Sequence, residues 1–342
     1  MQRSLRLSLS LSGVAALALS NAALLPATAQ DAGSADDLGV MEINLKDAVK
    51  PNIGFQGALQ GAGTPNQAGI GGFLPIAVGE NSVFFADVLL NANFADYGND
   101  SSIINTDVAG TTISTSSRLG YRWLNSDRSW MYGLNAGYDS RPMNTGGTDT
   151  GINVSGTEKS AFFQQVAVNA EAVSNSWNFN AYALLPVGET EQQLNSVYQG
   201  GALDTYGLDI GYFITPVVNA SVGYYYQSGD LGSADGSGVL GRVAYEVSNG
   251  LTAGVNISYD EAFDTRVSAD IKVRFGGASL TSQRKDVQLL PVINALTSAP
   301  DNRNVRTHDN SLRPRLSCPA GYYLLGRQDL GTLRCRNLNT LE

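Results

Sequence analysis

"RLGYRWLNSDRSWMYGLNAGYDS", residues 118–140, contains two runs in which aromatic residues alternate with Gly, Arg or Asn, on either side of a polar stretch at 125–129. Tyr121 and Trp123 share one register of the first run, and Trp130 begins the corresponding register of the second. A period of two places successive side chains on opposite faces of a β-strand, and an α-helix does not sort residues in this way. The stretch therefore predicts two antiparallel strands joined by a tight turn, with one aromatic face and one polar face.

The same alternation recurs along most of the chain in segments much longer than the five or six residues typical of soluble strands. A tilted strand crosses a bilayer with about ten residues, of which only every second one has to be apolar. These segments predict an all-β protein, a transmembrane antiparallel up-and-down β-barrel of about twelve strands, and a soluble antiparallel sandwich is the alternative. The candidate strands lie near 51–62, 67–78, 82–94, 113–124, 129–140, 159–173, 176–187, 201–214, 217–228, 237–248, 251–260 and 265–276.

Long and short connections alternate between these segments. The tight connections include 125–128 and Asn249-Gly250, which is a two-residue hairpin signal. Outer-membrane barrels have short periplasmic turns and longer extracellular loops, so we expect this arrangement at the cell outer membrane. The long connections are rich in Asn, Asp, Gly, Ser and Thr and lie at 95–112, 141–158, 188–200 and 229–236.

The first residues resemble a secretory signal, with basic Arg3 and Arg6, an apolar stretch at 7–19 and small residues at 27–29. The alternative, a membrane anchor, would need a longer apolar run. Removal of this segment changes the net charge from −9 to −11, which excludes binding of nucleic acid by general electrostatic attraction. Only 15% of residues are charged, while the chain has 38 Gly and 15 Tyr, a composition unlike that of an average soluble domain.

The C-terminal part lacks any sustained period and contains the two cysteines, Cys318 and Cys335. In a secreted chain the simplest expectation for such a pair is a disulfide that closes a small loop module, and metal binding by two thiols is the weaker alternative. The predicted divisions are a signal peptide at 1–29, a periplasmic lead at 30–50, the barrel at 51–276, a linker at 277–316 and the disulfide module at 317–342.

The two registers of the strands assign residues to the two faces of the barrel. Aromatic residues near strand ends suit the membrane interfaces, and we assign to this girdle Tyr121, Trp123, Trp130, Tyr132, Tyr138, Trp177, Tyr224, Tyr226 and Phe275. Mixed charges on the polar register suit a lumen, either filled or conducting, and we assign to it Arg118, Arg122, Asp209, Arg242, Glu246, Asp270, Lys272 and Arg274.

Catalytic chemistry finds little support in this sequence. Acid–base or nucleophilic catalysis by histidine requires a positioned imidazole, and the single histidine, His308, is expected to be solvated in the linker beside Asp309. No acidic spacing resembles a calcium loop. We therefore predict no enzyme activity, no cofactor and no metal site.

The stretch at 118–142 resembles the β-domain of the inverse autotransporters, the intimin and invasin family. The resemblance rests on Gly120-Tyr121-Arg122-Trp123 followed by Trp130, Gly133, Asn135 and Tyr138-Asp139, with the stretches 54–60 and 81–94 upstream. It implies a monomeric twelve-stranded outer-membrane barrel, with lipid and the barrel-assembly machinery as partners and a linker that threads back through the pore to display a passenger. The sequence departs from the family's pattern: we expect no room for a peptidoglycan-binding module before the barrel, and 66 residues follow 276 where the family has a row of immunoglobulin-like domains. The resemblance therefore does not carry adhesion over to this chain. The alternative is a small porin-like channel with a periplasmic tail.

Overall fold

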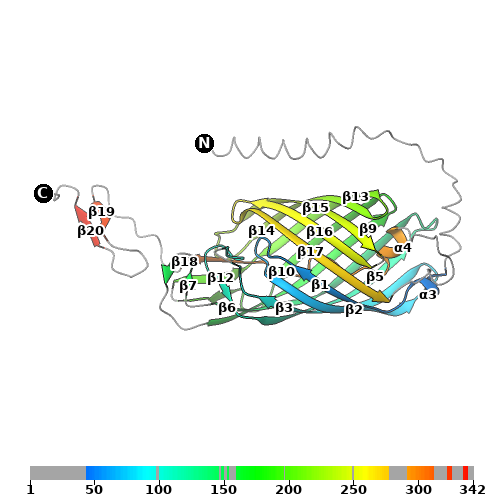
Figure 1. Cartoon of the computed structure of the whole chain (residues 1–342), viewed down its shortest axis with the longest axis horizontal. Helices are drawn as coiled ribbons and strands as arrows, with labels where there is room; N and C mark the ends of the chain where they lie inside the picture. Colours follow the sequence, from blue (N-terminus) through cyan, green and yellow to red (C-terminus); the bar gives the residue numbers. More distant parts are fainter. Residues whose placement is uncertain are drawn as a thin grey trace, which may run out of the picture. The chain divides into compact units, whose positions relative to one another are not determined.

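The fold is a closed antiparallel β-barrel, seen from the side in Figure 1. The computed structural model describes residues 44–97, 100–145, 148–149, 152–153, 159–195, 197–248, 250–276, 291–311, 322–325 and 334–337. The main sheet has thirteen strands; one, β4 (Val108–Ala109), pairs only with the end of β6, and the other twelve form the barrel. These twelve are β1 (Asn52–Ala58), β2 (Asn66–Val78), β3 (Ser82–Phe94), β5 (Thr112–Leu124), β6 (Trp130–Thr145), β9 (Lys159–Ser174), β10 (Trp177–Pro186), β13 (Asp204–Thr215), β14 (Val218–Ser228), β15 (Gly236–Ser248), β16 (Leu251–Asp260) and β17 (Asp264–Gly276).

Each barrel strand pairs with its neighbours along the chain, and the pairing of β1 with β17 closes the ring. The stretch that opened the sequence analysis forms the β5–β6 hairpin, in which Trp123 lies opposite Tyr132 and Gly120 opposite Asn135. Closure leaves no unpaired edge among the twelve strands, which is the condition for a sheet to be stable in lipid.

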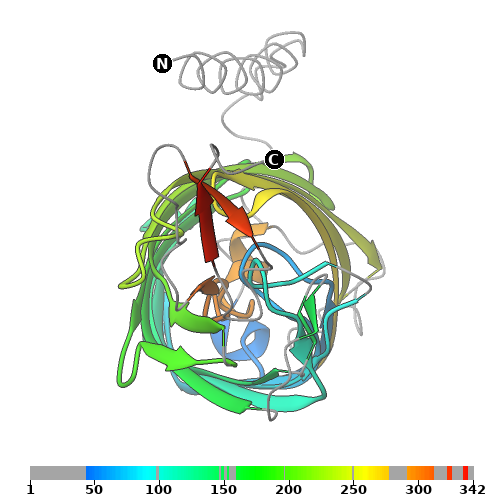
Figure 2. The ribbon, with the colours of Figure 1, turned by 90° about the vertical axis from the view of Figure 1, so that its left-hand side faces the viewer.

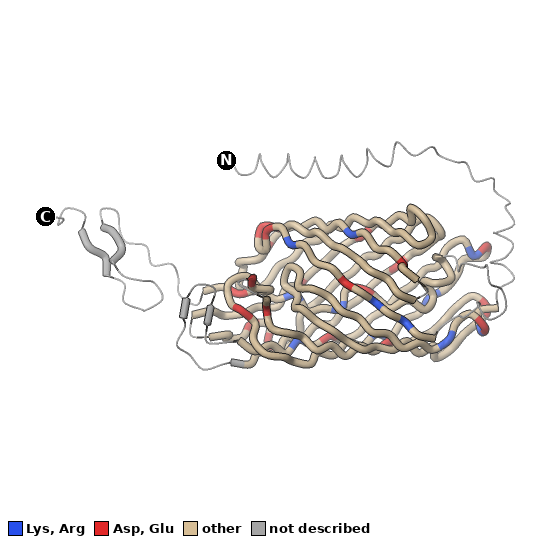
Figure 3. Tube along the Cα trace, viewed as in Figure 1, with Lys and Arg blue, Asp and Glu red and all other residues tan. Residues whose placement is uncertain are grey.

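The two faces of the barrel differ in polarity, as the period of two predicts. On β3, the side chains of Val83, Phe85 and Asp87 are buried, while Phe84 and Val88 between and beside them are exposed. The outward register is apolar around the ring, and few charged residues lie on the strands (Figure 3). An exposed apolar belt of this size is the surface expected of a barrel in lipid.

The two ends of the barrel carry different connections. One end, here called the short-turn rim, carries the connections 79–81, 125–129, 175–176, 216–217 and 249–250 together with the start of β1 and the end of β17. The other end, the long-loop rim, carries the connections 59–65, 95–111, 146–158, 187–203, 229–235 and 261–263.

Several short elements accompany the barrel. The helix α3 (Leu45–Ala48) precedes β1, and α4 (Pro291–Ala295) follows the barrel. None of the helices in the described part of the chain is long and apolar enough to span a bilayer. A three-stranded sheet is formed by β11 (Glu191–Gln193), β12 (Tyr198–Ala202) and β18 (Thr307–Ser311), and the hairpins β7–β8 (Thr148–Asp149, Ile152–Asn153) and β19–β20 (Tyr322–Leu325, Arg334–Asn337) form separate sheets.

The predicted fold class and the twelve strands are confirmed, with shifts at strand ends. The fifth strand is longer than predicted and continues to Thr145, because β6 pairs with β9 over sixteen residues into the loop region. Conversely, the predicted 201–214 strand begins only at Asp204, since Gly201 and Ala202 pair with β18 instead. The signal peptide lies outside the described residues.

Candidate functional site in the barrel lumen

The lumen contains part of the chain's own C-terminal region, residues 291–311, here called the threaded segment. Figure 2, which looks along the barrel, shows this segment in orange inside the ring of strands. Its contacts with the wall are spread along the barrel axis. At the short-turn rim, the Thr297 carbonyl oxygen accepts a hydrogen bond from the Asn52 side chain at 3.2 Å. At the opposite end, β18 pairs antiparallel with β12 in the connection that leads into β13 at the long-loop rim. The segment therefore passes from one rim to the other.

Most of the wall contacts are made to the main chain of the threaded segment. Arginine and amide side chains of the barrel donate hydrogen bonds to its carbonyl oxygens, which satisfies an extended chain that has no helix or ladder of its own there. The pairs are Asn52 and Arg274 with Thr297, Arg122 with Leu296 and Ser298, Arg118 with Asn302, Gln165 with Asn304, and Arg141 with Val305.

Two arginines of the threaded segment instead contact side chains of the wall. Arg303 pairs with the buried Asp87 carboxylate of β3, and its Nε donates to Ser116 Oγ at 2.8 Å. Arg306 lies 3.4 Å from the buried Asp260 carboxylate, with its guanidinium 4.5 Å from the centroid of the Tyr225 ring. Buried carboxylates require a charged or hydrogen-bonding partner, and the segment supplies a cation to each of these two.

The wall arginines are fixed by carboxylates of neighbouring strands. Arg118 forms a bidentate pair with Asp139 on β6, at 2.6 and 2.7 Å, and both side chains are buried. Arg122 pairs with Glu171 on β9 at 2.7 Å and lies over the Phe85 ring. A guanidinium held by a carboxylate on one side presents its remaining N–H groups in a fixed direction, here toward the segment.

The threaded segment fills the lumen unevenly. Lumen-facing residues of β3, β5, β6 and β9 are almost all buried, whereas those of β13 to β17 are half-buried toward the short-turn rim. Asp301, in the middle of the segment, keeps 66% of its side chain exposed, and its partner Lys272 on β17 keeps 36%. The segment is therefore packed more tightly against the β3–β9 wall than against the β13–β17 wall.

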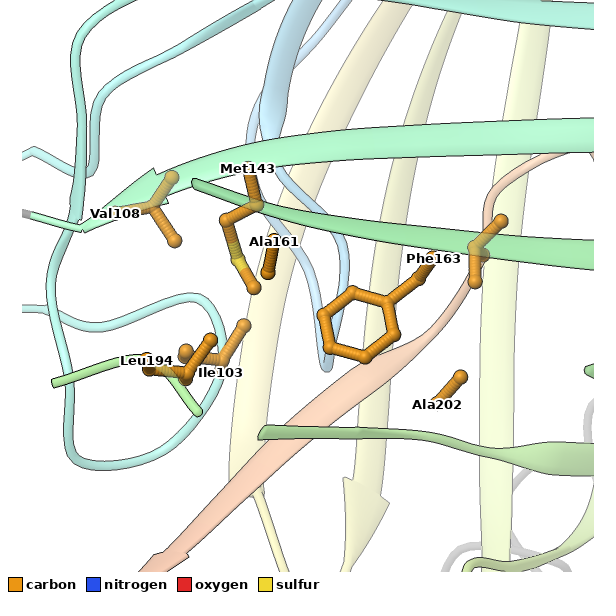
Figure 4. Close-up of a cluster of buried hydrophobic side chains, with 8 residues drawn as sticks. Ile103, Val108, Met143, Ala161, Phe163, Leu194 and Ala202 are labelled. Atoms are coloured by element: carbon orange, nitrogen blue, oxygen red, sulfur yellow. The ribbon is translucent and has the colours of Figure 1, made fainter. Parts of the chain in front are cut away.

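At the long-loop rim the threaded segment is surrounded by packed side chains. Figure 4 shows an apolar cluster between the ends of β6 and β9 and the neighbouring loops, which Val305 of the segment joins. On the other side of the rim, Leu203 and Phe263 belong to a second buried cluster. Members of the first cluster are Ile103, Val108, Met143, Ala161, Phe163, Leu194, Ala202 and Val305.

The single histidine lies in this closed region, and the prediction that it is solvated is wrong. His308 is fully buried on β18, where its Nδ1 lies 2.8 Å from Ser233 Oγ. Its Nε2 has no hydrogen-bond partner among the described residues, and the neighbouring Asp309 accepts instead from Asn105 and Thr106. Burial against a strand of the loop region overrides the polar sequence around it. Within the described part of the chain, no third group bonds to the imidazole to orient it, as a catalytic Ser–His pair requires.

The sequence-assigned lumen residues occupy the inner register, and they fall into two groups. Arg118, Arg122 and Arg274 contact the threaded segment. Arg242 pairs with Asp270 across the wall, and Lys272 pairs with Asp301. Asp209 is half-buried in the middle of β13, and Glu246 lies at the short-turn rim, where its Oε1 accepts from the Gly250 amide at 3.4 Å.

The assigned girdle residues lie on the outer register, and most group by rim. Near the short-turn rim, Trp123 lies between Tyr121 and Tyr132, with its ring centroid 5.7 and 5.9 Å from theirs. Trp130 and Trp177 continue this row through Phe179, and Phe275 lies at the end of β17. Tyr224 and Tyr226 lie on the long-loop half of β14, and Tyr138 donates from its hydroxyl to Gln164 at 2.6 Å.

Sequence reasoning missed several residues of the site. Asp139 lies on the inner register within the predicted 129–140 strand but was not assigned to the lumen. Arg141 continues that register, so a longer strand prediction would have found it. No periodic signal marks Arg303 or Arg306, because the segment is held by the wall rather than by a ladder. Cys318 lies outside the described residues, and Cys335 lies on β20, whose side chains are likewise outside that description.

The described residues contain no candidate metal site. No group of three or more His, Cys, Asp or Glu side chains in the described part of the chain is placed to hold a metal ion.

Comparison with known proteins gives a similarity of fold only. No family model and no curated protein matches the chain. A structure solved in work on the in-meso crystallization of membrane proteins aligns with a TM-score of 0.53 and 11% identity, over 76% of this chain and 99% of that one. The KdgM porin aligns with a TM-score of 0.35 and 9% identity, over 66% and 99% of the two chains. The β-domain of the Bordetella autotransporter BrkA aligns at 0.35 and 14%, over 67% and 99%.

Proposed function

We propose that this protein is an outer-membrane β-barrel anchor that holds its own C-terminal segment in its lumen and delivers the residues beyond 311 to the cell surface. The observation that carries the proposal is the threaded segment, whose contacts run from Thr297 at the short-turn rim to β18 at the long-loop rim. In bacterial barrels the short turns are periplasmic and the longer loops extracellular. On that orientation the segment leads outward. The resemblance of 118–142 to the inverse autotransporters supports the same function.

Lipid and the barrel-assembly machinery are the partners that this function requires, with a monomeric barrel as the assembled form. The exposed apolar belt supports contact with lipid, and the closed ring needs no second chain to complete it. The proposed role is structural rather than catalytic.

The side of the membrane reached by the C-terminal region is the direct test. A membrane-impermeant maleimide is added to intact cells after reduction, so that Cys318 and Cys335 can react. We expect labelling in intact cells, as for a Glu189→Cys control in a long loop. A Ser126→Cys control in a short turn should react only after the outer membrane is permeabilised. If Cys318 and Cys335 react only after the outer membrane is permeabilised, as expected for Ser126→Cys, surface delivery is contradicted.

A channel is the second candidate, and the looser packing of the threaded segment against the β13–β17 wall favours it. The Lys272–Asp301 ion pair on that side is not fully covered by other side chains. Planar-bilayer conductance separates the two functions. An anchor sealed at the long-loop rim conducts only after residues 277–342 are deleted, whereas a channel conducts as the full-length chain. The tail of such a channel would stay in the periplasm.

A further inference from the structure

The wall holds the threaded segment by two kinds of contact: hydrogen bonds to its main chain, and contacts with particular side chains. Hydrogen bonds to carbonyl oxygens can form with any extended polypeptide, because every residue offers the same acceptor. The main-chain contacts of Arg118, Arg122 and Arg141 would therefore hold the segment in many axial positions. A single position requires contacts that depend on side-chain identity.

Arg303 and Arg306 supply such contacts inside the lumen. Their carboxylate partners, Asp87 on β3 and Asp260 on β16, retain only 3% and 1% exposure. Removing the cation from a buried ion pair is strongly destabilising, because an uncompensated charge is left behind. Asp260 also accepts hydrogen bonds from the Tyr225 hydroxyl and the Ala262 and Phe263 amides, so the need for a cation is strongest at Asp87. Each wall carboxylate still favours an arginine at its own level along the barrel axis.

The spacing of the two arginines makes one axial position better than its neighbours. Shifts of one or two residues place no arginine beside either carboxylate. A shift of three residues toward the short-turn rim would bring Arg306 to Asp87 but Asp309 to Asp260, which sets two acids against each other. The opposite shift would leave Asp87 beside Pro300. Only the observed position gives both carboxylates a cation.

We propose that Arg303 and Arg306 set the axial register of the threaded segment and so fix the point at which the chain stops in the lumen. Arg303 and Arg306 are positioning residues. The wall arginines bind main-chain carbonyl oxygens and therefore hold the segment whatever its sequence. The inference rests on the proposed function only in that the segment has to enter the lumen. It does not depend on which compartment the C-terminal region reaches, so the two can fail separately.

Cysteine cross-linking reads the register directly. In a full-length chain with Cys318 and Cys335 changed to Ser, Gln165→Cys on β9 is combined with Asn302→Cys, Asn304→Cys or Thr307→Cys and bridged by a short bifunctional thiol reagent. Gln165 Nε2 lies 3.3 Å from the Asn304 carbonyl, so position 304 should react best. In R303Q/R306Q the yield at 304 should fall about tenfold or more, with reaction spreading to the other positions.

Lys272→Gln is the matched control, because it breaks an ion pair to the same segment whose partners are solvent-exposed. Its cross-linking pattern should equal that of the parent. Closure of the barrel in every variant is checked by mobility of the unheated protein in detergent gels. If the barrel of R303Q/R306Q does not close, a second test exchanges the charges of the Arg303–Asp87 pair. R303D should lose the cross-link between positions 165 and 304, and D87R/R303D should restore it. An unchanged pattern in R303Q/R306Q, or no restoration by D87R/R303D, overturns the proposal.

Discussion

At the scale of single residues, His308 and Asp309 form a pair of buried groups with opposite responses to pH. Both belong to β18, outside the twelve barrel strands. Burial lowers the pKa of His308 to about 4, against an opposing effect of Asp235. Burial also raises the pKa of Asp309 to about 6, although hydrogen bonds from Thr106 and Asn105 oppose the shift. The two shifts act on the same strand in opposite directions.

The signs follow from proton binding. When β18 is released, His308 takes up a proton near pH 6.5, which it resists while buried, so its contribution to stability is lost as pH falls from 6.5 toward 4. Buried Asp309 takes up a proton near pH 6 rather than 3.8, so its contribution increases as pH falls through that window. In the parent chain the two effects largely offset each other.

Single substitutions should separate these effects. When the pH is lowered from 7 to 5, the His308→Gln variant, which keeps only Asp309, should hold β18 closed more strongly. The Asp309→Asn variant, which keeps only His308, should hold it more weakly. Each change should be about tenfold in the equilibrium constant for opening of β18, since one pKa unit corresponds to a factor of ten. Hydrogen exchange of the β18 amides, corrected for its intrinsic pH dependence, measures this. The same pH profile in both variants would contradict the assignment.

At the scale of elements, the tight turn between β15 and β16 depends on a glycine that accepts an unusual backbone angle. Gly250 in the β15–β16 turn has a φ of 77°, and a Cβ there would lie 2.4 Å from the Arg274 carbonyl oxygen. An L-residue is strained at such an angle, and the contact is with backbone, which cannot move aside easily. The turn thus fixes where β16 begins against β17.

Gly250→Ala should therefore destabilise this hairpin, by about 1–3 kcal/mol on the scale of backbone strain. Gly241→Ala, inside β15, is the control because its Cβ would meet only ordinary contacts, the nearest at 3.4 Å. Refolding yield in lipid vesicles and urea unfolding of the reconstituted barrel measure the difference. Equal losses for the two variants would mean that the angle at Gly250 is not the constraint.

At the scale of the whole molecule, one continuous sheet separates two very different environments. Adjacent residues of β14 show this: Val222 is 51% exposed on the outer face, whereas Ser221 faces the lumen. A charged side chain on the lipid face of a barrel costs about 2–4 kcal/mol near the bilayer midplane, while lumen positions tolerate polar change. The free-energy cost of a charged side chain therefore depends on which face of the barrel it occupies, and not on which strand carries it.

Val222→Lys should accordingly reduce barrel stability in bilayers by about 2–4 kcal/mol, and Ser221→Lys should change it little. Urea unfolding of both variants in vesicles, followed by tryptophan fluorescence, provides the measurement. In detergent micelles, where a lysine reaches water more easily, the difference should shrink. A similar cost in both media would argue against burial of this face in a bilayer.

The sequence by itself determined the barrel wall: the alternation at 118–140 sorts side chains onto two faces, and the tight turn at 125–129 sets the pairing of β5 with β6. Such features are local, since a period of two depends only on successive residues of one strand. Which residues lie in the lumen, and which wall side chains hold them, were decided only by the tertiary structure. Arg303 meets Asp87 across more than two hundred residues of chain, and the segment that carries it has no period because its carbonyls are bonded to the wall. His308, a histidine in a polar stretch, is buried because β18 pairs with β12, a strand distant in the sequence.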